Sequence, residues 1–149
     1  MRFGFGRRLR HPFYPALKLA PAAKARHEAP ALCGGCEELF LAAAAGVRVR
    51  RAVFPLRLPA EPFLSPLERD TLWDRFKVPI YALLLDGHGR LIGYECEAQQ
   101  GIHLVEDYAP GLLFGRIESA ACECGRPGVR LMPPVGQAEE IHQQTLLAG

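Results

Sequence analysis

Apolar residues in the middle of the chain recur first in a helical and then in a strand-like pattern. The segment Glu37–Ala45 begins with two acidic residues, continues with apolar ones and is followed by Gly46. Acidic residues favour the first turn of a helix and glycine favours its end, so this segment predicts a short helix. Val47–Leu58 then intersperses β-branched residues with arginines, which predicts a strand.

A second helix is predicted to begin after Ser65. Ser65 can cap the helix, Pro66 suits its first position and Glu68 can complete a capping box. We expect this helix to end before Pro79. Its predicted apolar stripe consists of Leu72, Trp73 and Phe76.

Short apolar runs separated by glycine turns predict an antiparallel sheet in the C-terminal half. Ile80–Leu85 and Leu91–Ala98 flank the turn Asp86–Gly89, which is a good hairpin signal. The further predicted strands are Ile102–Val105, Leu112–Cys124 and Val129–Met132. Within this half, Cys96-Glu-Ala and Gly101-Ile-His-Leu104 echo Cys122-Glu-Cys and Gly128-Val-Arg-Leu131, although the match is too short to distinguish a repeat from chance.

Together these elements predict a single α+β domain: a largely antiparallel sheet that ends in a β-meander, with two or three helices. The length of 149 residues suits one domain with one core. Residues 1–30 are predicted to be an irregular, basic, proline-rich arm, with no strand over the polar residues 24–31. Residues 31–134 form the predicted core domain, and residues 135–149 a tail that can become helical.

Charge changes the picture mainly in the N-terminal arm. The whole chain is net +2, yet residues 1–27 contain seven cationic residues and no acid before Glu28. Arginines there would neutralise phosphates while the aromatic residues stack on bases, which makes a nucleic-acid-binding module one alternative. The small net charge of the whole chain favours another interpretation, in which the aromatics pin the arm to the core or to a second subunit of a homodimer.

Composition bears on the compartment of the protein. Lys18 and several prolines interrupt what would be the apolar part of an export signal, and no apolar run approaches the roughly 18 residues of a membrane span. We therefore expect a cytoplasmic protein with no membrane partner. The absence of asparagine suggests a thermophile, in which heat-labile residues are avoided.

The strongest chemical signal is a set of cysteines. Four of the five fall into two close pairs, Cys33-x-x-Cys36 and Cys122-x-Cys124. In a reduced cytosol such pairs more often bind metal or do redox work than form structural disulfides. Zinc takes four such ligands as a tetrahedron, so we predict a structural zinc held by Cys33, Cys36, Cys122 and Cys124. An iron–sulfur cluster is the less favoured occupant.

The remaining polar candidates have weaker patterns. Cys96 alternates with Ile92 and Tyr94 on one predicted strand face, which is typical of a core cysteine. His103 is predicted on a strand surface, where it would rarely line a polar site with Glu95 and Glu97. No nucleophile elbow, phosphate loop or dinucleotide fingerprint is present, so enzymatic activity is not the leading prediction.

Residues 33–93 resemble the thioredoxin/glutaredoxin group. Cys33-Gly-Gly-Cys36 opens a predicted helix, a strand and a second helix follow, and Val78-Pro79 leads into a hairpin. The resemblance implies a thiol–disulfide oxidoreductase in which Cys33 is the nucleophile, Cys36 the resolving thiol and Pro79 part of the substrate groove. The leading prediction remains a zinc-binding protein with a binding or scaffold role; thiol–disulfide exchange and nucleic-acid binding are the alternatives.

Overall fold

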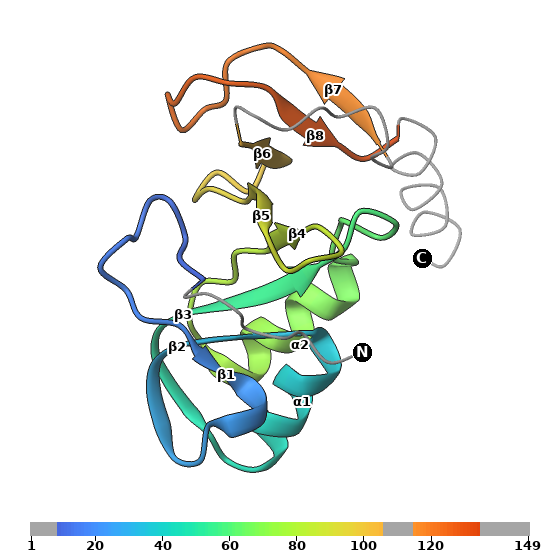
Figure 1. Cartoon of the computed structure of the whole chain (residues 1–149). Helices are drawn as coiled ribbons and strands as arrows, with labels where there is room; N and C mark the ends of the chain where they lie inside the picture. The colour runs from blue at the N-terminus through green and yellow to red at the C-terminus, as the bar shows by residue number, and fades with distance from the viewer. Residues whose placement is uncertain (1–8, 106–114, 135–149) are drawn as a thin grey trace.

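The computed structural model describes residues 9–105 and 115–134, whose strands form one mixed sheet (Figure 1). The sheet has eight strands in the order β1-β2-β3-β4-β5-β6-β8-β7. The strands are β1 (Ala20–Pro21), β2 (Glu28–Gly34), β3 (Arg48–Arg57), β4 (Leu83–Leu85), β5 (Leu91–Tyr94), β6 (Ile102–Leu104), β7 (Arg116–Glu118) and β8 (Arg130–Met132). The helices of the described part are α1 (Cys36–Ala44), α2 (Pro66–Phe76) and the short 3-10 helix η1 (Ala22–Lys24).

The direction of the strands divides the sheet into two parts. Strands β1 to β4 run parallel to one another, and α1 and α2 connect β2 to β3 and β3 to β4. The pairs from β4 to β7 are antiparallel, and they make up four of the seven pairings. The sheet is therefore mostly antiparallel, in agreement with the predicted α+β class. Its parallel end contains the two helices because parallel neighbours need a long crossover connection, usually a helix.

The helices form where the local sequence predicts them. Gly46 adopts a φ of 84° directly after α1, a conformation that favours glycine and ends the helix. The Oγ of Ser65 accepts the N–H of Glu68 at 3.1 Å and the Glu68 carboxylate accepts the N–H of Ser65 at 2.9 Å, which confirms the capping box of α2. Trp73 does not belong to the buried stripe: it is 51% exposed, because it lies about 100° around the helix from Leu72.

The prediction that residues 28–30 belong to an irregular arm is wrong, because they begin β2. This strand pairs with β1 on one side and β3 on the other, so backbone pairing outweighs its polar and proline-containing start. Pro30 has no N–H to donate, and the register with β3 shifts there, between Ala29 and Ala31. Proline in a sheet is typically found at such irregularities.

The C-terminal half matches the predicted hairpin but not a simple meander. Strands β4 and β5 pair around the predicted turn, where one carboxylate oxygen of Asp86 accepts the N–H groups of His88 and Arg90. Strand β6 pairs with β8 and not with β7, so β8 lies between β6 and β7 in the sheet. The predicted strand Leu112–Cys124 corresponds only to the shorter β7, which ends at Glu118. Residues 112–114 of that prediction, and the predicted C-terminal tail, lie outside the described residues.

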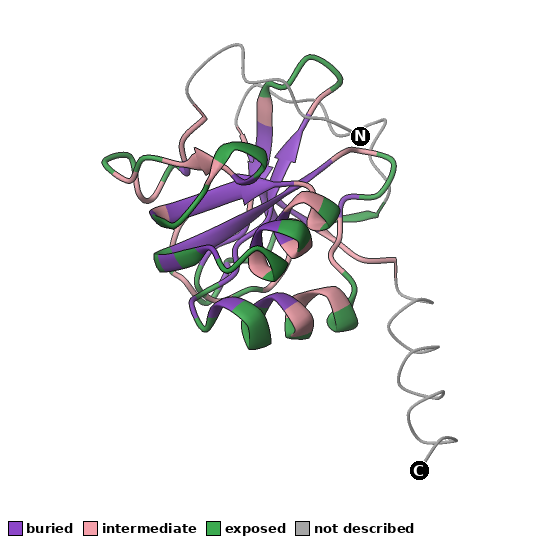
Figure 2. Cartoon of the chain, turned by 90° about the horizontal axis from the view of Figure 1, so that it is seen from below, coloured by how far each residue is buried: buried purple, intermediate pink, exposed green. Residues whose placement is uncertain are grey.

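The parallel part of the sheet is covered on both faces. One cluster joins the helices to the sheet through Leu39, Leu72 and Val53, and Figure 2 shows the strands mainly buried and the outer faces of the helices exposed. On the other face, Leu9, Tyr14, Leu17 and Leu19 pack against a second cluster that contains Phe54. Residues 9–19 thus belong to the packed structure. No helix in the described ranges is long and apolar enough to cross a membrane.

Candidate metal centre

Three cysteines and one histidine converge at the antiparallel end of the sheet. The ligand atoms of Cys96, His103, Cys122 and Cys124 all lie within 4.8 Å of one another. The Sγ atoms of Cys96 and Cys122 are 3.6 Å apart, and the Sγ of Cys124 lies 3.6 Å from the Nε2 of His103. Sulfur and imidazole nitrogen are ligands for transition metals, so this group could hold a metal ion.

Two similar turns supply the sulfur ligands. Cys96 lies between β5 and β6, and its carbonyl accepts the N–H of Gln99 at 3.0 Å. Between β7 and β8, the carbonyl of Cys122 accepts the N–H of Gly125, also at 3.0 Å. Gln99 and Gly125 both have positive φ, 53° and 82°. The faint internal repeat of the sequence therefore corresponds to two turns of the same kind.

The pairing of β6 with β8 brings these turns together. His103 lies opposite Arg130 in this antiparallel pair, next to Ile102 opposite Leu131. Arg130 donates from Nη1 to the carbonyl of Gln100 at 2.7 Å and from Nη2 to that of Ala120 at 3.2 Å. One buried guanidinium thus binds the backbone on both sides of the ligand cluster.

Burial and neighbouring charges shift the pKa values of three of the four side chains in the cluster, in different directions. Cys96, His103 and Cys122 are buried, and Cys124 is partly exposed. Burial, with Arg130 and Arg126 nearby, lowers the pKa of His103, which keeps the imidazole in the neutral form that binds metals. Burial raises the pKa of Cys96 to about 11, whereas for Cys124 the N–H of Arg126 and neighbouring thiols outweigh burial and lower the pKa.

The N-terminal segment packs directly against this centre. The Phe13 ring lies edge-on to Tyr94 at 4.9 Å between centroids and to His103 at 6.0 Å. The guanidinium of Arg126 lies over the face of the Phe13 ring, 3.5 Å from its centroid. Its Nη1 also donates to both carboxylate oxygens of Glu97 at 2.9 Å. These contacts support the expectation that aromatic residues pin the N-terminal segment to the core.

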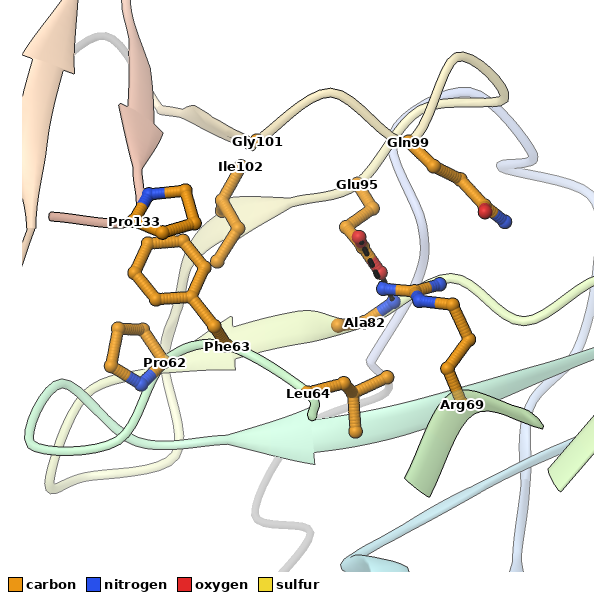
Figure 3. Close-up of a pocket in the computed structure, with 10 residues that line it drawn as sticks. All are labelled: Pro62, Phe63, Leu64, Arg69, Ala82, Glu95, Gln99, Gly101, Ile102 and Pro133. Atoms are coloured by element: carbon orange, nitrogen blue, oxygen red, sulfur yellow. Dashed lines mark hydrogen bonds and ion pairs between the residues drawn. The ribbon is translucent and has the colours of Figure 1, made fainter. Parts of the chain in front are cut away.

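Glu95, directly before Cys96, connects the centre to α2 and β4. Its carboxylate accepts the N–H of Ala82 and the Nη2 of Arg69, both at 2.6 Å, and Figure 3 shows the two charged side chains facing each other. They border a cavity of about 160 Å³ whose apolar wall includes Phe63 and Ile102. Glu95 and Arg69 already bind each other there, so we assign this cavity no ligand.

The structure gathers a different set of four from the set that the sequence predicts. Cys122 and Cys124 are common to both, but Cys33 and Cys36 lie at the end of β2 and the start of α1. Strands β3, β4, β5 and β6 separate β2 from β8, a spacing on the order of 24 Å at about 4.8 Å per strand. Cys96 and His103 occupy the two positions instead.

Cys33 and Cys36 have surroundings of another kind. Cys33 is fully buried in the cluster that contains Phe54, and burial raises the pKa of its thiol to about 12. For Cys36, burial and the neighbouring Glu68 raise the pKa to about 11, although Nη1 of Arg57 lies 3.7 Å from its Sγ. Both shifts disfavour the thiolate that disulfide exchange requires. Pro79 is exposed, and its carbonyl accepts the N–H of Val53 at 3.0 Å.

Cys96 and His103 were missed because their local pattern is that of a strand. The alternation from Ile92 to Ala98 predicts that β5 continues, whereas β5 ends at Tyr94 and a turn follows. The internal repeat is the signal that would have found them, since it aligns Cys96 with Cys122. No protein-family model matches this sequence, and no curated protein matches it either.

Proposed function

We propose that this chain binds one zinc ion through Cys96, His103, Cys122 and Cys124. The observation that carries the proposal is the spacing of the ligand atoms. Bond lengths of about 2.3 Å to sulfur and about 2.0 Å to nitrogen give tetrahedron edges of roughly 3.8 Å between sulfurs and roughly 3.6 Å between sulfur and nitrogen. Two of the six distances between ligand atoms, Cys96 to Cys122 between sulfurs and Cys124 to His103 between sulfur and nitrogen, are 3.6 Å, and all six are within 4.8 Å.

The role of the ion would be structural. Three cysteines and one histidine complete a tetrahedron and leave no open position for a substrate. The strands around the centre are three or four residues long, and among the described residues their apolar cluster has five buried members: Leu84, Ile92, Ile102, Leu104 and Leu131. A core of this size benefits from a metal, which contributes on the order of 10 kcal/mol to folding in small zinc domains.

Metal content tests the proposal. Tag-free protein purified without chelator should contain about one zinc per chain by elemental mass spectrometry. Cys124→Ser should lose most of that zinc. Cys36→Ser is the matched control, because it changes a half-buried cysteine outside the cluster and should keep the metal. Equal loss in both variants, or no metal in the parent protein, would contradict the proposed site.

The zinc site supports a binding or scaffold role better than the thiol–disulfide alternative. Disulfide exchange by Cys33 and Cys36 predicts a reversible disulfide between them and loss of activity in Cys33→Ser. The raised pKa values of both thiols argue against a reactive thiolate at that position. A disulfide between Cys33 and Cys36 that exchanges with a substrate, in protein free of metal, would reverse this preference.

A further inference from the structure

Cationic side chains gather at the end of the sheet where β2 and β3 begin. Strands β2 and β3 are parallel neighbours and begin at the same edge of the sheet, so the first residues of the two strands and the residues just before them lie close together. Glu28 is opposite Arg48 in the register, and the N–H of Arg48 donates to the carbonyl of His27 at 2.9 Å. The exposed cations at this edge, here called the basic edge, are Arg26, Arg48, Arg50 and Arg51.

The irregularity in β2 and β3 shapes the basic edge. Between the pairs Ala29↔Val49 and Ala31↔Ala52, one residue of β2 faces two residues of β3, and these two are Arg50 and Arg51. Such a bulge lets both side chains point to solvent instead of alternating across the sheet. Both arginines are exposed in consequence, while Val49 and Ala52 on either side are buried.

The charge of the basic edge is largely uncompensated. Its four cations face one acid within the same segments, Glu28, which gives the edge a net +3 in a chain whose total is +2. The Nε of Arg50 lies 3.2 Å from the Glu28 carboxylate, but both side chains are more than half exposed. Exposed ion pairs of this kind stabilise by about 0–1 kcal/mol, so an incoming phosphate can displace the carboxylate.

We propose that the basic edge binds the phosphate backbone of a nucleic acid. All four of its cations are arginines, whose planar guanidinium groups bind phosphate oxygens in pairs. They are spread along two strand ends, with Arg48 to Arg51 alone spanning on the order of 10 Å. A row of charges fits a repeating polyanion better than a single small anion. The basic edge lies at the parallel end of the sheet, so this proposal does not depend on the zinc site.

Salt-dependent binding tests the proposal on the full-length, metal-loaded protein. Fluorescence anisotropy with a short duplex DNA and with a single-stranded RNA should give micromolar affinity that falls steeply between about 50 and 200 mM salt. Arg48→Gln/Arg51→Gln should weaken binding at least tenfold and reduce the slope of log K against log salt for the duplex by about 2. Arg90→Gln/Arg116→Gln removes the same charge from exposed positions elsewhere and should leave both quantities nearly unchanged.

Three outcomes would overturn the proposal. The first is the absence of salt-dependent binding to either nucleic acid. The second is binding that the Arg48→Gln/Arg51→Gln variant retains in full but that is lost when residues 1–8 are deleted, which would move the site to the N-terminal arm. The third is an equal loss in both double variants, which would show a general charge effect. Circular dichroism of each variant confirms that the fold is retained.

Discussion

The guanidinium carbon of Arg126 lies 3.5 Å from the centre of the Phe13 ring, so a residue of the N-terminal segment contacts one that directly follows the turn from Cys122 to Gly125 in the candidate metal centre. The same guanidinium binds both carboxylate oxygens of Glu97, next to Cys96. One side chain therefore connects the two turns of the metal centre with the segment that covers them. Weakening any one of these contacts should therefore weaken the others.

Removing the guanidinium should release the N-terminal segment while zinc stays bound. Arg126→Ala loses a cation–π contact of about 0.5–1 kcal/mol and a partly exposed ion pair of at most about 1 kcal/mol. Amide hydrogen exchange of residues 11–17 should accelerate several-fold, and that of β2 should not change. Glu97→Gln is the control that removes the ion pair alone, and it should show the smaller effect. Unchanged hydrogen exchange of residues 11–17 in Arg126→Ala would show that the N-terminal segment does not depend on this contact with the candidate metal centre.

Chelation should affect the two ends of the sheet unequally. Without metal, β6 and β8 retain only short strands and a small apolar cluster, whereas β2 and β3 keep the clusters on both faces. We expect hydrogen exchange of residues 96–104 and 122–132 to accelerate far more than that of residues 29–56. Readdition of zinc should restore protection. Uniform loss of protection along the chain would show instead that the metal controls the whole fold.

The buried carboxylate of Glu95 should be costly to remove. Glu95→Ala removes the carboxylate partner of Arg69, which is a quarter exposed and keeps its hydrogen bond to the carbonyl of Ile80, and it leaves the N–H of Ala82 without an acceptor. Breaking such a pair costs about 3 kcal/mol, measurable as a lower free energy of unfolding in urea. Asp74→Ala breaks the exposed pair with Lys77 and should cost less than about 1 kcal/mol. Similar values for the two variants would contradict the burial of the first pair.

His11 should make stability depend on pH. Its Nε2 lies 2.7 Å from the carbonyl of Glu95 and its Nδ1 accepts the N–H of Phe13, a pattern that only the neutral ring satisfies. Burial lowers the pKa of His11 below 6.5, so its contribution is present above pH 6.5 and is lost as the pH falls from there through the folded-state pKa.

The comparison variant for this effect is His11→Gln, which keeps a donor but does not titrate. With zinc saturating, the parent protein should lose more unfolding free energy than this variant between about pH 7.5 and 5.5, by up to about 1.4 kcal/mol per pH unit. Equal losses in the two proteins would assign the pH dependence to other groups, His103 among them.

Local signals in the sequence are enough for the helices and one hairpin, but not for the sheet order. The capping box at Ser65 and the glycine after α1 act within one turn of chain, so they can be predicted without knowing the partner elements. Strand β2 could not, because it begins with the charged Glu28 and Pro30 interrupts it; pairing with strands on both sides decides its structure.

The metal centre was half predictable for a related reason. Cys122 and Cys124 are neighbours in sequence, and close cysteines indicate metal binding on their own. Their partners depend on which strand β8 pairs with, and that pairing is non-local. The turn after Tyr94 also requires a left-handed conformation at Gln99, a residue type that does not indicate one. The sequence pattern therefore placed Cys96 on a strand, whereas it lies in the turn after β5; His103 does lie on the strand β6, but the pattern did not show which residues it would meet.

The two similar turns have a consequence for how a metal ion would be bound. Cys96 and His103 come from one turn and strand, and Cys122 and Cys124 come from the other turn, so each half offers two of four ligands. A peptide with one half would have to meet a second copy to enclose the ion, and its affinity would fall on dilution. Covalent linkage gives each half a fixed effective concentration of the other, so the affinity of a single chain for the ion would not depend on the protein concentration.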